Sequence, residues 1–234
     1  MLDQFNFLPF SSSLNIAILL IILVALEAVL SADNAIALAS ISQGLEDPKI
    51  QRRALNFGLA FAYILRVALI LTATWVVQFW QFELLGAAYL LWLVFRYFTS
   101  PEDEQQNHTG NRFSSLWQVI PLIAITDLAF SLDSVTTAIA VSEKTWLVIT
   151  GGTIGIIALR FLTELFLRWL KEFAHLEDAG YITVALVGIR LLLKAINPVL
   201  EPPEWLVISA ITLVFIWGFS KRADTNFSVN REDS

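Results

Sequence analysis

The sequence predicts an all-α integral membrane protein with seven transmembrane helices, arranged as a 3+3 inverted repeat plus one additional helix, and with the N-terminus outside. Three observations predict this fold class. Hydrophobic residues make up 56% of the 234 residues and charged residues only 15%, whereas soluble domains carry roughly 25% charge. The apolar residues gather in long stretches. One acidic motif occurs in two of these stretches, a hundred residues apart.

Each of the seven apolar stretches is expected to cross the bilayer as a helix. Roughly 20 apolar residues span a bilayer in this form, and the strict alternation of a membrane β-strand is missing. The third, sixth and seventh stretches are the shorter ones. In chain order the stretches cover residues 14–41, 55–80, 82–98, 116–141, 145–169, 179–196 and 204–220.

The basic residues predict the orientation, because inner loops carry an excess of Lys and Arg. With the N-terminus outside, only Lys144 and Lys194 fall on the outer side. The inner loops and tail then hold Lys49, Arg52, Arg53, Arg96, Arg112, Arg168, Lys171, Lys221, Arg222 and Arg231. The segment before the first stretch has no Lys or Arg, so it does not look like a signal peptide.

Composition divides the chain into five segments, of which two are polar and three carry helices. A polar stretch with turn-forming residues near the middle of the chain predicts a cytoplasmic loop. The seventh helix lies outside the repeat, and its expected role is packing or covering an edge. The segments are 1–98 (N-terminal outside segment and first repeat), 99–115 (loop), 116–196 (second, inverted repeat), 197–220 (seventh helix) and 221–234 (cytoplasmic tail).

Two motifs carry the repeat. LEAVLSADNAIALA covers residues 26–39 and TDLAFSLDSVTTAIA covers residues 126–140. At an offset of 100, Glu27 aligns with Asp127, Ser31 with Ser131, and Asp33 with Asp133. The next helix of each half repeats a second feature: Gly58 precedes Arg66 by eight residues, and Gly152 precedes Arg160 by eight. Three-helix units duplicated in opposite orientation are a known way to build transporters, with the substrate site near the midplane.

The acids of these motifs lie where ionised side chains are costly. Glu27 and Asp127 fall near the middle of their stretches, and Asp33 and Asp133 follow about two turns later. A charge at bilayer depth costs at least about 2.5–3.5 kcal/mol. Two interpretations are open. The acids form a cation site, or they pair with helix arginines (Arg66, Arg160 and Arg190) and hold helices together.

Helix geometry leaves a second choice open. On a regular helix Asp33 and Asp133 are turned about 120° from Glu27 and Asp127. Either the helix unwinds near 31–34 and 131–134, which brings both acids of a motif to one cavity, or the two acids serve different sites. We favour the unwinding, because transporters often bind ions at interrupted helices.

The arginines within the helices have two candidate roles, as structural counter-ions or as gating residues that occupy the carboxylates when no ion is bound. Arg160 lies one turn before Glu164, a spacing at which the two pair. Five deep acids (Glu27, Asp33, Asp127, Asp133 and Glu164) against three arginines leave a balance of two negative charges, which suits a divalent cation.

The ligand chemistry points to a hard cation. The chain has no cysteine and two histidines, which excludes thiolate metal sites and disfavours imidazole-rich zinc sites. Carboxylate, amide and hydroxyl oxygens suit Mg²⁺, Ca²⁺ and Mn²⁺, with protons and Na⁺ as rivals. No tightly bound cofactor is expected. The net charge of -6 argues against nucleic acid as a partner.

The two motifs, the arginine-bearing helices and the seven-helix plan resemble the TerC family of integral membrane proteins over about residues 14–220. The family is close in fold to the LysE-type exporters. It was named for tellurium resistance, and its members are associated with Mn²⁺ export and, in plants and cyanobacteria, with thylakoid biogenesis. The resemblance implies a multi-pass protein of a plasma or thylakoid membrane. It implies metal-site roles for Glu27, Asp33, Asn34, Asp127 and Asp133, with Ser131 and Ser134 as weaker candidates.

Three functions follow as hypotheses. The first is a divalent-cation exporter, for Mn²⁺ (or Ca²⁺), that holds the ion between the first and fourth helices and exchanges it for protons. The second is a membrane-protein assembly or thylakoid-biogenesis factor that acts by binding other membrane proteins. The third is an intramembrane aspartyl protease, against which the absence of a GxGD signature argues, since Asp33 follows Ala and Asp133 follows Leu.

Overall fold

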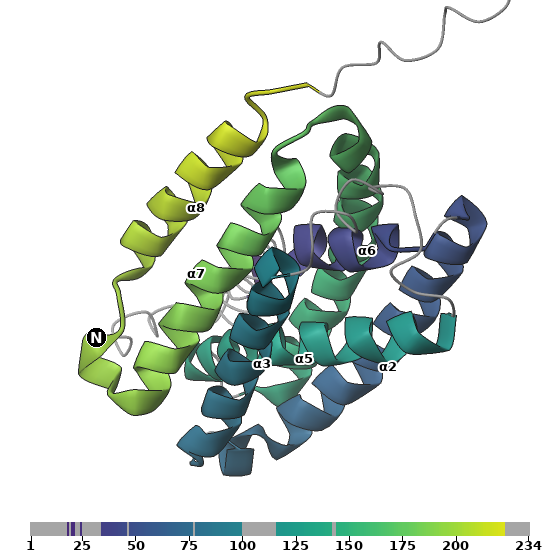
Figure 1. Ribbon diagram of the computed structural model, residues 1–234. Coiled ribbons are helices and arrows are strands. Elements are labelled where there is room, and N and C mark those ends of the chain that lie inside the picture. The colour runs from purple at the N-terminus through teal and green to yellow at the C-terminus, as the bar shows by residue number, and fades with distance from the viewer. Residues whose placement is uncertain are drawn as a thin grey trace, which may run out of the picture.

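The computed structural model describes residues 34–45, 47–76, 78–99, 116–141 and 144–222, with residues 18, 20, 21 and 24 as isolated positions (Figure 1). Glu27, Ser31 and Asp33 lie outside the described residues. Within the described ranges every regular element is helical, and an isolated β-bridge joins Phe173 to Arg222. The predicted all-α class is therefore confirmed for this part of the chain.

The helices have the following bounds. Residues 34–43 are helical and continue the first apolar stretch. They are followed by α2 (Pro48–Val76), α3 (Trp80–Thr99), α5 (Leu116–Val141), α6 (Thr145–Glu172), α7 (Leu176–Ile196), the 3-10 turn η2 (Pro198–Leu200) and α8 (Glu204–Gly218). Among the described residues, α2, α3, α5, α6 and α7 are long and apolar enough to cross a membrane, and α8 is shorter.

The start of α2 differs from the prediction, because the helix begins seven residues before the apolar stretch does. Asp47 caps it by accepting a hydrogen bond from the backbone N–H of Lys49 at 2.8 Å, and Pro48 takes the first helical position, where no N–H is needed. The added turns carry exposed basic residues. Hydropathy ends a stretch at such residues, although the backbone stays helical through them.

Two helix pairs form the centre of the bundle. α2 packs most extensively on α5, and α3 packs on α7. Contacts between α3 and α5 join the two pairs, and α6 packs on α2. α8 lies on the outside along α7 (Figure 1). Large apolar side chains such as Trp117 (82% exposed) and Phe161 (71% exposed) cover much of the exterior, as expected of a surface that faces lipid.

The close approach of α2 to α5 depends on a glycine. A Cβ atom at Gly58 would lie 2.7 Å from Cγ2 of Ile123, a distance at which one helix must shift. The helices can therefore touch here only because this residue has no side chain. This contact lies two turns before Arg66 on α2 and one turn before Asp127 on α5, so it sets the position of both.

Polar contacts join α3 and α7 at both ends. Near the end of α3, the Tyr97 hydroxyl donates a 2.7 Å hydrogen bond to Asp178 at the start of α7. Near the end of α7, Lys194 lies 3.4 Å from Glu83 at the start of α3. The two helices therefore run antiparallel. This is the relation expected between the third helices of inverted units, although the inverted repeat as a whole and the outside N-terminus stay predictions.

The predicted unwinding near 131–134 is wrong. α5 is a continuous helix from Leu116 to Val141. The Ser131 hydroxyl donates to the Asp127 carbonyl at 2.7 Å, and the Thr136 hydroxyl donates to the Leu132 carbonyl at 2.6 Å. These hydroxyls are satisfied within the helix, so they need no break in the backbone. The corresponding prediction for residues 31–34 falls largely outside the described residues.

Candidate functional site

A buried ion pair between α2 and α5 lies at the centre of the candidate site. The Arg66 guanidinium nitrogen Nη2 lies 3.1 Å from Asp127 Oδ1, and the two side chains are 2% and 0% exposed. The Ser131 hydroxyl lies 3.4 Å from the other carboxylate oxygen. The buried charge of Asp127 is thus balanced by an arginine from the neighbouring helix, a contact that both the counter-ion and the gating interpretation require.

This pair lies deep in the bundle. Asp127 is the twelfth of the 26 residues of α5. At about 1.5 Å per residue it is roughly 17 Å from the start of a helix about 39 Å long. It therefore falls close to the bilayer midplane, where a lone carboxylate costs at least about 2.5–3.5 kcal/mol. Arg66 supplies the compensation that such a position requires.

A small cavity adjoins Arg66 on the side of α6. Its volume is about 20 Å³, enough for about one water-sized occupant. Ser134 contributes a hydroxyl, and Gly151 and Gly152 leave the space that side chains would fill. The lining residues are Arg66, Ile70, Ser134, Val135, Ala138, Val148, Gly151 and Gly152. Arg66 is the residue that both contacts Asp127 and borders this space.

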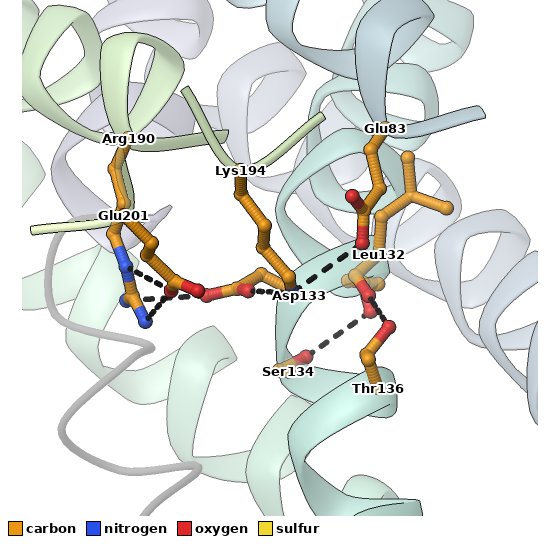
Figure 2. Close-up of polar contacts among 9 residues, drawn as sticks. Glu83, Leu132, Asp133, Ser134, Thr136, Arg190, Lys194 and Glu201 are labelled. Atoms are coloured by element: carbon orange, nitrogen blue, oxygen red, sulfur yellow. Dashed lines mark hydrogen bonds and ion pairs between the residues drawn. The ribbon is translucent and has the colours of Figure 1, made fainter. Parts of the chain in front are cut away.

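Asp133 belongs to a different network, which joins it to residues of α7 (Figure 2). Its carboxylate oxygens lie 2.8 Å from Lys194 Nζ and 3.2 Å from Arg190 Nη1. Lys194 also reaches Glu83 of α3 at 3.4 Å, and Arg190 reaches Glu201 after η2 at 2.8 Å. This outer network, as we name these five residues, links α5 to α3, α7 and the segment before α8.

The structure therefore separates the two acids of the second motif. Because α5 is unbroken, six residues turn Asp133 about 120° away from Asp127, and each acid meets its own cations. The interpretation in which they serve different sites matches this geometry. Within the ranges that the structure describes, no three Asp, Glu, His or Cys side chains converge to hold a metal ion.

The charge count made from the sequence needs correction. Lys194, which was predicted on the outer side and left out of the charge count, lies in the last turn of α7 and is 16% exposed. Glu83 and Glu201 join the same network. Lys194 stands four residues after Arg190, so a pair of cations on one helical face was the sequence signal for this network. The two carboxylates carried no such signal, because they follow from tertiary packing.

Glu164 lies with arginines near the surface rather than with the other acids. Arg160 contacts it at 3.0 Å across one helical turn, so the pair predicted from the spacing is confirmed. Arg52 of α2 lies at 3.0 Å and Arg168 at 3.7 Å. Arg160 also donates a 2.6 Å hydrogen bond to Asn56. Arg66 and Arg160 occupy equivalent positions in the repeat, yet Arg160 is 24% exposed.

The remaining predicted site residues lie near the same centre or outside the described residues. Ser131 is buried against Asp127, and Ser134 lines the cavity beside Arg66. Asn34 is buried at the point where the described part of the first helix begins. Asp33, directly before it, and Glu27, two turns before it, fall among residues that the structure does not describe.

Long apolar helices, an apolar exterior and buried ion pairs together define a multi-pass helical membrane protein. The chain belongs to the family described as "Integral membrane protein TerC family", whose model matches residues 12–227. The predicted resemblance is therefore confirmed, over almost the whole chain.

Three relatives illustrate the range of the family. The chain is 35% identical to the uncharacterized membrane protein YceF of Bacillus subtilis over 72% of this chain and 68% of that protein. It is 29% identical to YkoY of the same organism over 85% and 67%. It is 27% identical to the chloroplastic thylakoid membrane protein TERC of Arabidopsis thaliana over 72% and 52%. No solved structure matches the chain.

Proposed function

We propose that the protein is a membrane transporter that exports a divalent cation, with Mn²⁺ as the expected substrate. The observation that carries this proposal is the Arg66–Asp127 ion pair, buried near the midplane beside a cavity of about 20 Å³. A carboxylate at that depth is costly to maintain, and a purely structural contact between helices is made more cheaply by apolar residues. Binding of a charged substrate would explain why an ionised group is present at this depth.

In this proposal Arg66 occupies the carboxylate when no metal is bound. An arriving divalent cation competes with the guanidinium for Asp127, and Ser131 adds an oxygen on the same face of α5. Glu27, Asp33 and Asn34 of the first motif are the proposed additional ligands. Such oxygen ligands suit Mn²⁺ or Ca²⁺ and carry no preference for copper or zinc. The Arg66 side chain borders the cavity on the α6 side, and release of the carboxylate requires that it shift on this side.

Asp133 has a distinct role in the proposed cycle. It lies six residues after Asp127 on α5, about 9 Å further along the axis, toward the outer side in the predicted orientation. The outer network holds this end of the bundle closed, because it joins α5 to α3, α7 and the segment before α8. Opening outward requires that these ion pairs separate. A cation that reaches Asp133 competes with Lys194 and Arg190 for its carboxylate. Protons that bind the same carboxylates are the proposed counter-substrate.

Transport in reconstituted vesicles tests the proposal. Purified protein in liposomes that contain an Mn²⁺-quenched dye should show Mn²⁺ uptake, and Asp127→Asn and Asp133→Asn should each slow the initial rate by about tenfold or more, as loss of a metal-site residue does. Asp47→Asn is the matched control, because this exposed acid only caps α2 and Asn caps equally well. Uptake by both the Asp127→Asn and the Asp133→Asn variant at the unaltered rate contradicts the proposal.

A cell-based measurement separates transport from the assembly hypothesis. Cells that express the unaltered protein should hold less Mn than cells that express Asp33→Asn or Asp133→Asn. An assembly factor would instead keep its protein partners in co-purification with Asp127→Asn, and substitutions at its surface would matter more than those at the midplane. If Asp33→Asn and Asp133→Asn lower intracellular Mn as well as the unaltered protein does, the export proposal fails.

A further inference from the structure

A second charged cluster lies apart from the midplane, where α2 and α6 meet the surface. Arg52, Arg160 and Arg168 surround the single carboxylate of Glu164 at 3.0, 3.0 and 3.7 Å. We call these four residues the arginine cluster. Three guanidinium groups share one carboxylate, so the cluster keeps an excess of two positive charges. None of these residues takes part in the contacts of Asp127 or Asp133.

The cluster is positioned at the depth of lipid headgroups. Arg52 is the fifth residue of α2 and Arg168 is four residues before the end of α6, which places both about 6 Å from the helix ends. Their side chains are 59% and 69% exposed, whereas Arg66 is fully buried. In the predicted orientation this end faces the inner leaflet, the side on which anionic lipids interact with basic residues.

Exposed apolar side chains of α6 continue from the cluster toward the middle of that helix. Leu165 and Phe161 lie three and seven residues before Arg168, within about 60° of it around the helix, and both are exposed. α2 and α6 pack together. A guanidinium group near the surface with apolar side chains one and two turns deeper is the arrangement that suits a lipid whose head is anionic and whose chains are apolar. A small free anion would make no contact with the exposed apolar side chains.

We infer that the arginine cluster binds the phosphodiester headgroup of an anionic phospholipid at the α2–α6 edge, with an acyl chain along Leu165 and Phe161 of α6. Glu164 holds the three arginines in place and leaves Arg52 and Arg168 with donors to spare. Guanidinium groups donate paired hydrogen bonds to phosphate oxygens, and the flat group matches this geometry. Glu164 is therefore a positioning residue for the lipid site, which is independent of the proposed transport function.

Lipid binding to the full-length protein in neutral detergent tests the inference. Native mass spectrometry should show dioleoyl phosphatidylglycerol bound in preference to dioleoyl phosphatidylcholine, and phosphatidylglycerol should raise the thermal midpoint of unfolding. Arg52→Gln and Arg168→Gln should each weaken phosphatidylglycerol binding by about tenfold, the expected effect of one lost charge-assisted contact. Arg96→Gln is the matched control, because it removes an exposed arginine at the same end of the bundle, on α3.

Three outcomes would overturn the inference. They are equal binding of the two lipids, unchanged phosphatidylglycerol binding in both cluster variants, and a stabilisation by inorganic phosphate that matches that of phosphatidylglycerol. The third result would assign the cluster to a free anion instead of a lipid. Arg168→Lys guards against a folding defect, since it keeps the charge and loses the paired geometry. This variant should fold normally and bind phosphatidylglycerol more weakly than the unaltered protein.

Discussion

The buried pair between Arg66 and Asp127 makes a quantitative prediction about stability. Arg66→Met keeps an unbranched apolar stem and removes the guanidinium that lies 3.1 Å from a fully buried carboxylate. Removal of one partner from a buried ion pair costs about 3–5 kcal/mol, because the other charge stays buried. The Ser131 hydroxyl at 3.4 Å is too distant to replace a charge-assisted hydrogen bond. We therefore expect Arg66→Met to lower the free energy of unfolding by about 3–5 kcal/mol.

A double-mutant cycle separates this effect from simple loss of packing. In Arg66→Met/Asp127→Asn no charge of the pair stays buried, so stability should return to within about 2 kcal/mol of the unaltered protein. Unfolding of the purified proteins in mixed micelles, titrated with a denaturing detergent, measures all four members of the cycle. Lys171→Met, which removes an exposed cation at the end of α6, is the control and should change stability by no more than about 0.5 kcal/mol.

Two results would refute this reasoning. If Arg66→Met costs less than about 1 kcal/mol, the carboxylate is not charged and buried as the geometry indicates. If the double variant is as unstable as the sum of the two single variants, the residues do not interact energetically. In either case Asp127 could not serve as an ionised ligand that Arg66 protects.

Three other substitutions test the packing and the second network. Gly58→Val places atoms against Ile123, where even a Cβ comes within 2.7 Å, and should cost about 1–3 kcal/mol in the same unfolding assay. Lys194→Gln removes one of the two cations that contact Asp133 and should lower the free energy of unfolding by about 1–2 kcal/mol. It should also increase the rate at which a single cysteine, introduced at the outer end of α7, is labelled. Tyr97→Phe loses a 2.7 Å hydrogen bond to the carboxylate at the start of α7 and should cost about 1.5–3 kcal/mol by thermal unfolding.

Each of these has its own control and its own contrary result. Gly152→Ala should be nearly neutral, because its Cβ would meet Arg66 Cδ at an ordinary 3.6 Å; a neutral Gly58→Val would show that the α2–α5 contact is looser than described. Lys144→Gln removes the other predicted outer cation, and equal labelling rates in both lysine variants would argue against the outer network as a closure. For Tyr97→Phe, the ring stays stacked on Tyr181, so no loss of stability would mean that the hydroxyl contributes nothing.

The helices could be predicted from the sequence because the bilayer imposes one simple requirement. A spanning segment must be long, apolar and internally hydrogen-bonded, and these properties are visible in the order of residues. α3 and α7 accordingly begin and end within three residues of the predicted stretches. The start of α2 was missed because its first turns are basic, and hydropathy cannot distinguish a charged helical turn from a loop.

The sequence repeat could be recognised from its acids. The cation that pairs with each acid could not be predicted in the same way. Arg160 and Glu164 are four residues apart on one helix, so their pairing followed from local geometry. Arg66 and Asp127 are 61 residues apart, and Arg66 was one of three candidate arginines for any of the acids. Arg66 and Arg160 also show that equivalent sequence positions need not have equivalent surroundings, since one is buried and the other is partly exposed.

The order of residues alone determined the membrane setting, the helical class and the acidic motifs, because each of these depends on hydropathy or on spacing along a single helix. Only the tertiary structure decided that α5 stays unbroken and that Asp127 faces Arg66 while Asp133 faces Lys194 and Arg190. The physical reason is that a side chain 120° around a helix meets whichever neighbour packs on that face. Helix packing depends on contacts such as that of Gly58 with Ile123, between residues that are far apart in the chain.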